Sequence, residues 1–244
     1  MKENKSYKIA DYQIRSNDHY ALTKYRIQMG WLPTRGNLRV LNAGCGSGEM
    51  NIFLCQNNSW SVDAVDMDPA ALEMSEDLKA KYCLDNLNIW HSDIESLPDE
   101  KDKYDIIVFN DVLEHVEDDV LVLKKLTDLL KPNGIMVISV PALQWLYGYH
   151  DEKLGHFKRY NKQNLSRKLK HFLKVEKSRY FAAVLIPIVL FYSCYKRKAY
   201  PIADLGKKSF MSRFITKTLQ FLLSIESVIA FPLGTSVLVL ATKP

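Results

Sequence analysis

The sequence predicts an α/β fold built on a mostly parallel, doubly wound sheet. Three observations support this prediction. Apolar segments of strand length alternate with amphipathic segments of helix length between residues 38 and 180, as in strand–helix–strand units with parallel pairing. Segment 104–109 is apolar almost throughout, as expected for a strand that helices cover on both faces. Residues 38–68 join a strand, a glycine-rich turn, a helix and a second strand that ends in a carboxylate, which is the plan of a nucleotide half-site.

Length and composition favour one ordinary globular unit. A chain of 244 residues can bury one substantial core, so a single domain over 1–244 is expected. The hydrophobic fraction of 47% and the charged fraction of 25% argue against a disordered or fibrous protein. Cys45, Cys55, Cys83 and Cys194 form no CxxC pair and follow no secretory signal, so neither a disulfide framework nor a zinc site is expected. These features favour the reducing cytoplasm.

The first expected strand leads into a turn that contains three glycines. Gly44, Gly46 and Gly48 allow the backbone to turn sharply and to approach a ligand more closely than a Cβ atom would permit. Glu49 begins the helix that follows. The second strand then ends at Asp66, whose carboxylate can accept hydrogen bonds from both hydroxyls of a ribose.

The turn reads NAGCGSG and resembles the first motif of the class I S-adenosylmethionine-dependent methyltransferases, in which an acidic residue and any residue precede GCGxG. Asn42 stands where that family usually has Asp or Glu, which keeps hydrogen bonding but removes a charge. The resemblance covers about residues 38–180 and 235–242. It implies a seven-stranded sheet whose last strand is antiparallel to the rest, and a cofactor-binding core over 38–180. The cofactor contacts that it implies are Gly44, Cys45, Gly46, Gly48, Asp66, Met67, Asp93, Ile94 and Asn110.

Asp68 and Pro69 predict the start of the next helix, because proline has no amide hydrogen to lose there and Asp68 can cap the free amides. The third strand reads NLNIWHSDIESLP and is expected to end near Asp93 and Ile94. In the resembling family, an Asp at this place accepts a hydrogen bond from the adenine amino group and the next residue packs on the ring. The alternative is a carboxylate that caps a short turn.

The fourth expected strand, 104–109, ends in the polar residues Asn110, Asp111, Glu114 and His115. This is the end of a strand at which open α/β sheets bind ligands. The resemblance places Asn110 beside the methionine part of the cofactor and makes His115 either a base at the methyl group or a supporting residue. An amphipathic helix is expected next, stopped by residues 131–134, and a fifth strand follows over 134–141.

The segment HDEKLGHFKRY after the fifth strand concentrates His150, Asp151, His156, Arg159 and Tyr160 within eleven residues. It resembles a subgroup of bacterial methyltransferases linked with glycan, lipid and natural-product pathways. Transfer of a methyl group to a hydroxyl requires removal of a proton, and histidine suits that task near neutral pH. We predict His156 as the base, oriented by Asp151 or His150, and Arg159 as the partner of an anionic substrate group.

Two alternatives remain open for this segment. Its His–Asp and Arg–Tyr pairs could simply hold the loop together. A metal site could also form from His150, Asp151 and His156, although no further ligand is evident from the sequence, so no metal is expected.

Residues 1–37 precede the first core strand and carry aromatic residues in a helix-compatible pattern. In related methyltransferases such an extension covers the cofactor and lines the substrate pocket, so a helical lid is expected here. The candidate substrate contacts are Tyr20 of this extension and, in the segment after the fifth strand, Tyr149, Arg159 and Tyr160. Packing on an amphipathic helix is an equal alternative for Tyr20.

The C-terminal part of the chain is basic. Residues 1–150 carry 15 Lys+Arg against 23 Asp+Glu, whereas residues 151–244 carry 18 against 5. Such a balance suits an anionic partner or, equally, a solvated surface. The expected helical insertion, 181–234, precedes a last strand over 235–244 and opens with an apolar run that Pro187 interrupts and that is too short to span a bilayer. Peripheral membrane contact, a substrate cap and a homodimer contact are the open interpretations of this insertion.

These observations predict a cytoplasmic enzyme, with peripheral membrane contact left open. Its reaction would move a methyl group from S-adenosylmethionine to a hydroxyl of a small-molecule acceptor, such as a sugar or a carrier-linked intermediate. The rivals are an N-methyltransferase of a small amine and a cofactor-binding scaffold without activity. A nucleic-acid partner is disfavoured, because NDVL stands after the fourth strand in place of an NPPY-type tetrapeptide.

Overall fold

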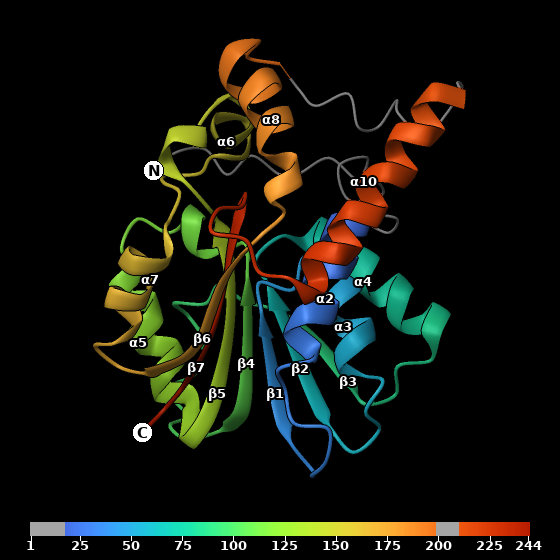
Figure 1. Cartoon of the computed structure of the whole chain (residues 1–244). Helices are drawn as coiled ribbons and strands as arrows, with labels where there is room; N and C mark the ends of the chain where they lie inside the picture. The colour runs from blue at the N-terminus through green and yellow to red at the C-terminus, as the bar shows by residue number, and fades with distance from the viewer. Residues whose placement is uncertain (1–17, 199–209) are drawn as a thin grey trace.

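The computed structural model describes residues 18–198 and 210–244, and its centre is a seven-stranded sheet in the order β3-β2-β1-β4-β5-β7-β6 (Figure 1). All strand pairings in it are parallel except those of β7, which runs antiparallel to both β5 and β6. The predicted fold class is therefore confirmed. The strands are β1 Arg39–Ala43, β2 Ser61–Asp66, β3 Leu87–His91, β4 Tyr104–Asn110, β5 Leu130–Pro141, β6 Lys174–Phe181 and β7 Ser236–Thr242.

Helices cover both faces of the sheet. The α-helices are α2 His19–Met29, α3 Glu49–Leu54, α4 Pro69–Tyr82, α5 Asp119–Leu129, α6 Tyr149–Leu154, α7 Lys162–Leu169, α8 Ile186–Val189 and α10 Phe210–Val228. In Figure 1, α5 and α7 lie on one side of the sheet and α3 and α4 on the other. The described residues also form short helical turns: η2 Leu113–His115, η3 Gln144–Leu146, η4 Ala183–Leu185 and the π-helix η5 Leu190–Tyr195.

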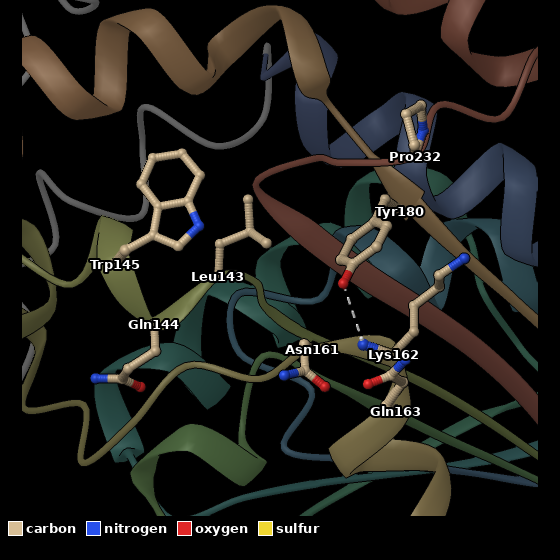
Figure 2. A pocket seen from close by; sticks show the side chains of 8 residues that line it. All are labelled: Leu143, Gln144, Trp145, Asn161, Lys162, Gln163, Tyr180 and Pro232. Carbon is tan, nitrogen blue, oxygen red and sulfur yellow. Dashed lines mark hydrogen bonds between the residues drawn. The ribbon is translucent and has the colours of Figure 1, made fainter.

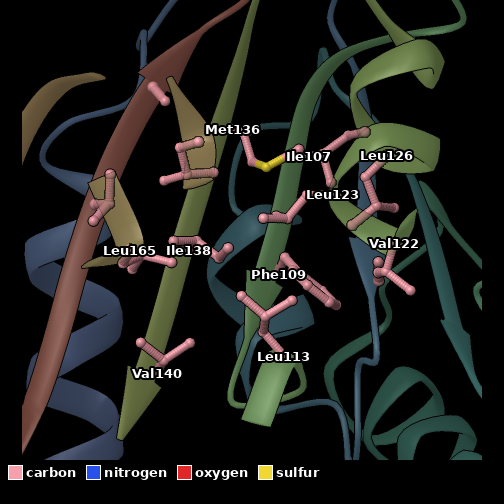
Figure 3. Packing of buried hydrophobic residues seen from close by; sticks show 14 of the residues in the cluster. Ile107, Phe109, Leu113, Val122, Leu123, Leu126, Met136, Ile138, Val140 and Leu165 are labelled. Carbon is pink, nitrogen blue, oxygen red and sulfur yellow. The ribbon is translucent and has the colours of Figure 1, made fainter. Parts of the chain in front are cut away.

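Two hydrophobic clusters follow from the alternation of side chains along the strands. Ile107 and Phe109 of β4 point to the face covered by α5, where they join Val122 and Leu123 (Figure 3). Ile106 and Val108, the intervening residues of β4, belong to the cluster on the opposite face. The continuous apolar run predicted from residue 104 is thus buried on both faces of the sheet. This burial holds β4 in place, and the candidate site lies at the carboxyl end of β4.

The strand order reverses between β1 and β4. From β1 the chain proceeds outward to β2 and β3, and it then returns to place β4 on the other side of β1. Such a reversal leaves a crevice at the carboxyl ends of the two central strands, where open α/β sheets bind their ligands.

The helix α5 and the strand β5 meet earlier than the sequence suggested. Residues 131–134 were expected to end the helix, but α5 ends at Leu129 and the strand begins at Leu130. Leu130 pairs with Tyr104, and the chain then bulges through Asn133, which has a φ of 62°, before regular pairing resumes at Ile135. Strand pairing therefore starts before the Pro–Asn–Gly segment and continues beyond it.

The insertion after β6 is helical where it is described. Pro187 lies in the first turn of α8, so it starts a helix and does not interrupt one. None of the helices within 18–198 and 210–244 is both long enough and apolar enough to cross a membrane. The helices α8 and α10 lie beyond the same end of the strands as α6 (Figure 1).

Candidate active site

The glycine-rich turn after β1 is packed too tightly for side chains at two positions. Gly44 has a φ of +72°, and a Cβ built on it would lie 2.3 Å from Cγ2 of Val112. Gly48 has a φ of +92°, and its Cβ would lie 2.5 Å from Oγ of Ser75. The amides of Gly44 and Cys45 both donate to the carbonyl oxygen of Val65, at 2.8 and 2.9 Å. The turn is thereby fixed to the end of β2.

Asp66 lies at that end of β2 and faces the turn. Its Oδ2 accepts a hydrogen bond from the amide of Gly46 at 2.7 Å, and its Oδ1 accepts one from the amide of Asp68 at 2.9 Å. Burial raises the pKa of Asp66, while these backbone donors oppose the shift. Each carboxylate oxygen can accept more than one hydrogen bond, so Asp66 keeps acceptor capacity for a ligand.

Other residues assigned to the cofactor flank Asp66. Met67 is 49% exposed, Asp93 is exposed and Ile94 is buried. Asp93 Oδ1 accepts the amide of Glu95 at 3.2 Å, so the capping role left open by the sequence is present as well. The cradle of glycines, the acceptor capacity of Asp66 and an exposed apolar side chain beside it fit an adenosine-containing cofactor.

Asn42 does not face this cradle. Its side chain is buried and donates to Oδ1 of Asn51 at 2.7 Å, and Asn51 in turn donates to Ser75 at 3.1 Å. The residue that replaces the usual acid of the motif therefore supports the turn through α3.

The helix α2 covers the end of β4. Gln28 and Asn110 exchange two amide hydrogen bonds of 2.7 and 3.0 Å, and Lys24 forms an ion pair with Asp111. Burial acts to lower the pKa of Lys24, but the carboxylate of Asp111 together with Tyr20 and Tyr25 raises the pKa above its ordinary value. Tyr20 hydrogen-bonds Ser236 of β7.

These contacts were only partly anticipated. Tyr20 also stacks on Phe181 with ring centroids 5.5 Å apart, so it packs on the sheet as the alternative interpretation proposed. Lys24 and Gln28 were missed, although Tyr20, Lys24 and Gln28 are spaced four residues apart and so lie on one helix face. The remainder of the expected lid, residues 1–17, lies outside the described residues.

The loop after α6 is organised by Asp151. Its Oδ1 contacts His156 Nδ1 at 2.8 Å and accepts from Arg159 Nε at 2.7 Å, while its Oδ2 accepts the amide of Gly148 at 3.0 Å. Burial acts to raise the pKa of Asp151, but these hydrogen bonds dominate and lower it to about 2. Because an ionised carboxylate can only accept, His156 carries its proton on Nδ1, and the lone pair of Nε2 is left for chemistry.

Arg159 and Tyr160 lie inside this loop. Arg159 is 6% exposed and also donates to the carbonyl oxygen of Ala142 at 3.2 Å. Tyr160 is 1% exposed and its hydroxyl donates to Asp119 Oδ2 at 2.9 Å. Both side chains thus hold the loop to the fold and are engaged within the protein, contrary to the prediction that they contact substrate. The alternative of a loop held by His–Asp and Arg–Tyr pairs is met in its His–Asp part, whereas Arg159 pairs with Asp151 and Tyr160 pairs with Asp119.

His150 and Tyr149 lie on α6. The His150 amide donates to Oγ of Ser193 at 3.0 Å, and burial lowers the pKa of its imidazole to about 4, so this side chain is neutral at pH 7. Tyr149 is half-buried. Asp151, and not His150, therefore orients His156.

His115 and Glu114 of η2 face His156 from the end of β4. The His115 and His156 rings meet edge to face with centroids 4.7 Å apart, and His156 Nε2 lies 3.9 Å from Glu114 Oε1. Glu114 is 1% exposed, and burial raises the pKa of its carboxyl well above the ordinary value. The structure therefore joins the loop after α6 to the carboxyl end of β4, as the prediction for His156 and His115 requires.

A separate pocket of about 490 Å³ opens between the η3 turn, the start of α7 and β6 (Figure 2). Trp145 and Tyr180 are its aromatic walls, and the Lys162 amide donates to the Tyr180 hydroxyl at 3.4 Å. None of the residues predicted to bind cofactor or to act in catalysis lines it.

Comparisons with known proteins are consistent with this geometry. The sequence profile of a family described as "Methyltransferase domain" matches residues 34–206. The ubiquinone biosynthesis O-methyltransferase of Bradyrhizobium diazoefficiens is 32% identical over 131 residues, which are 51% of this chain and 48% of that protein. The match thus spans about half the length of that relative.

Solved structures share the fold. The phosphoethanolamine N-methyltransferase 2 of Haemonchus contortus, in complex with S-adenosyl-L-methionine, aligns with a TM-score of 0.64 and 15% identity over 98% of this chain and 60% of that chain. An S-adenosylmethionine-dependent methyltransferase of Aquifex aeolicus aligns with a TM-score of 0.59 and 14% identity over 71% of this chain and 93% of that one. At these identities the likeness concerns the fold alone.

Proposed function

We propose, because the chain belongs to the methyltransferase domain family, that it transfers a methyl group from S-adenosylmethionine to a hydroxyl of a small molecule, such as a sugar or a carrier-linked intermediate. When bound, S-adenosylmethionine supplies a methyl group on a positively charged sulfur. The new C–O bond forms as the C–S bond breaks, so the acceptor oxygen must lose its proton to a base. An amine acceptor that arrives neutral needs less help of this kind.

The single observation that carries the proposal is the Asp151–His156 pair. Asp151 fixes the proton on Nδ1 of His156 and orients the ring, which leaves Nε2 as a proton acceptor beside the end of β4. Arg159 and the Gly148 amide both donate to the carboxylate of Asp151 and so hold this pair in place. A relative named as an O-methyltransferase supports the same type of acceptor.

We assign the cofactor to the crevice between β1, β2 and β4. Gly44 and Gly48 let the turn pack closely against Val112 and Ser75. Asp66 accepts the ribose hydroxyls, and Met67, Asp93 and Ile94 surround the adenine. Asn110 contacts the methionine end of the cofactor, and to do so it would give up one of its two hydrogen bonds with Gln28.

The test is methyl transfer from S-adenosylmethionine with a ¹³C-labelled methyl group to a panel of hydroxylated aromatic acids, monosaccharides and small primary amines. NMR identifies the atom that receives the label. We expect O-methyl products that disappear with His156→Ala and persist with His171→Ala, because His171 is an exposed histidine outside the site. Labelled N-methyl products alone would refute hydroxyl methylation, and undiminished turnover of His156→Ala would remove that residue from the mechanism.

We also propose peripheral contact between the insertion and an anionic membrane. Phe191 and Tyr195 of η5 and Phe221 of α10 are exposed, and the exposed cations Lys196 and Lys198 follow η5 directly. Co-sedimentation with phosphatidylglycerol vesicles, lost in Phe191→Ser and absent with phosphatidylcholine alone, is the expected result. Retention by neither kind of vesicle would refute it.

A further inference from the structure

Glu114, His115 and His156 bring three potential metal ligands to one place. One nitrogen or oxygen atom from each of these side chains lies within 4.8 Å of the others. Glu114 and His115 come from the η2 turn after β4, and His156 comes from the loop after α6. The amide of Phe157 donates to the carbonyl oxygen of Glu114 at 2.8 Å, which ties the two segments together.

The carboxyl of Glu114 is the unexplained member of this group. It is 1% exposed, and its Oε2 has no hydrogen-bond partner within the described parts of the chain. Buried polar atoms in folded proteins are nearly always paired, so an unpaired one points to an ion, a water or a ligand that completes it. Lys24, on the helix that covers the end of β4, is already engaged by Asp111.

His156 is prepared to act as a ligand. Asp151 Oδ1 accepts a hydrogen bond from His156 Nδ1 at 2.8 Å, and Nε2 then presents its lone pair 3.9 Å from Glu114 Oε1. A carboxylate that holds the far nitrogen of an imidazole in this way is the usual support of a metal-bound histidine. Two atoms bound to one ion at about 2.0 to 2.2 Å lie roughly 3 to 3.5 Å apart, so binding would draw these side chains slightly together.

We infer that Glu114, His115 and His156 bind a divalent transition-metal cation, with Zn²⁺ or Mn²⁺ as the best match to two imidazoles and one carboxylate. Three protein ligands leave at least one coordination position for an exchangeable oxygen. The set differs from the one considered from the sequence, because His150 is not a member and Asp151 supports a ligand instead of being one.

The consequence for the acceptor rests on the proposed function, whereas the binding of the ion does not. His156 Nε2 can take up a proton or coordinate an ion, but not both at once. With the ion in place, the cation would acidify an acceptor hydroxyl at the open position, and the proton would pass to solvent water because His156 Nε2 is occupied. The favoured acceptors would be those whose oxygen atoms coordinate metals, such as adjacent hydroxyls on an aromatic ring.

The test measures binding of Zn²⁺, without any methyl acceptor, to the full chain after treatment with a chelator. Isothermal titration should show one site for the unmodified protein, weakened at least tenfold in Glu114→Gln and in His156→Ala. Glu117→Gln and His171→Ala are matched controls, because both residues are exposed and outside the cluster, and they should bind as the unmodified protein does. Equal binding by Glu114→Gln and the unmodified protein would overturn the inference.

A second measurement on the unmodified protein covers the case in which a variant fails to fold. X-ray absorption at the zinc edge should show two imidazoles and oxygen ligands. A sulfur ligand would assign the ion to one of the four free cysteines and refute the site, as would failure to retain Zn²⁺. Methyl transfer that persists after chelation would leave the proposed function standing and limit the ion to a role outside the reaction.

Discussion

Replacing Gly44 by alanine tests how tightly the turn under the cofactor crevice is built. The φ of +72° at Gly44 is left-handed, and an L-residue with a Cβ costs about 1–2 kcal/mol there. The added Cβ would also lie 2.3 Å from Cγ2 of Val112, a contact that must be relieved by movement at a cost of about 1–3 kcal/mol. We therefore expect Gly44→Ala to lower the free energy of unfolding by about 2–5 kcal/mol, measured by urea denaturation followed by circular dichroism.

Gly155→Ala is the matched control. Gly155 has a φ of +77°, but a Cβ on it would meet nothing within 4 Å, so only the conformational cost of about 1–2 kcal/mol applies. Val112→Ala removes both methyl groups and leaves Val112 Cβ at 3.4 Å, so the double variant with Gly44→Ala should recover about 1–3 kcal/mol relative to additivity. The reasoning fails if Gly44→Ala is no more costly than Gly155→Ala, or if the two substitutions are additive.

Three further predictions concern charged groups. Asp66→Asn should weaken S-adenosylhomocysteine binding about 10- to 100-fold in calorimetry, because charged hydrogen bonds contribute about 1.5–3 kcal/mol, and an unchanged Kd would contradict the ribose assignment. His150 has a pKa of about 4 when folded and about 6.5 when unfolded, so its imidazole is protonated first in the unfolded chain on acidification. The contribution of His150 to stability should therefore fall by about 2 kcal/mol from pH 7 to pH 5, and His150→Gln should remove that part of the pH dependence of urea unfolding. An identical pH slope in the variant would refute this. Lys24→Met should lower the free energy of unfolding by about 1–3 kcal/mol, because Asp111 would lose its cationic partner but stays partly solvated. Arg26→Met, at an exposed position of the same helix, should lower it by under about 0.5 kcal/mol, as at other surface sites. Equal thermal shifts in the two variants would argue against the ion pair.

The strands and the glycine turn could be predicted because their signals are local. An apolar run from residue 104 to 109 is readable as a strand buried on both faces, and Asp68 before Pro69 marks a helix start that the structure confirms, with Asp68 accepting the amide of Ala70. The antiparallel last strand followed from the family resemblance and not from the residues alone.

The partners of the site residues could not be read from local patterns. Gln28 and Asn110 are 82 positions apart, and Glu114 meets His156 across 42 positions only because the loop after α6 folds back on the end of β4. Tyr160 was assigned to the substrate because its neighbours in sequence are polar, whereas its hydroxyl reaches Asp119, 41 positions away. Sequence therefore located the region of the site, and topology decided which of its side chains face one another.

The position of β7 has a consequence for the order in which this protein can assemble during synthesis. β7 is translated after β6 but lies between β5 and β6, and within the described residues it is the sheet neighbour of β6. Until residues 236–242 have left the ribosome, β5 presents an unpaired edge and β6 has no strand to join. The nascent chain must avoid wrong pairing at these two strands, so the interval between the synthesis of β6 and the release of β7 is a period of exposure to aggregation and to chaperones.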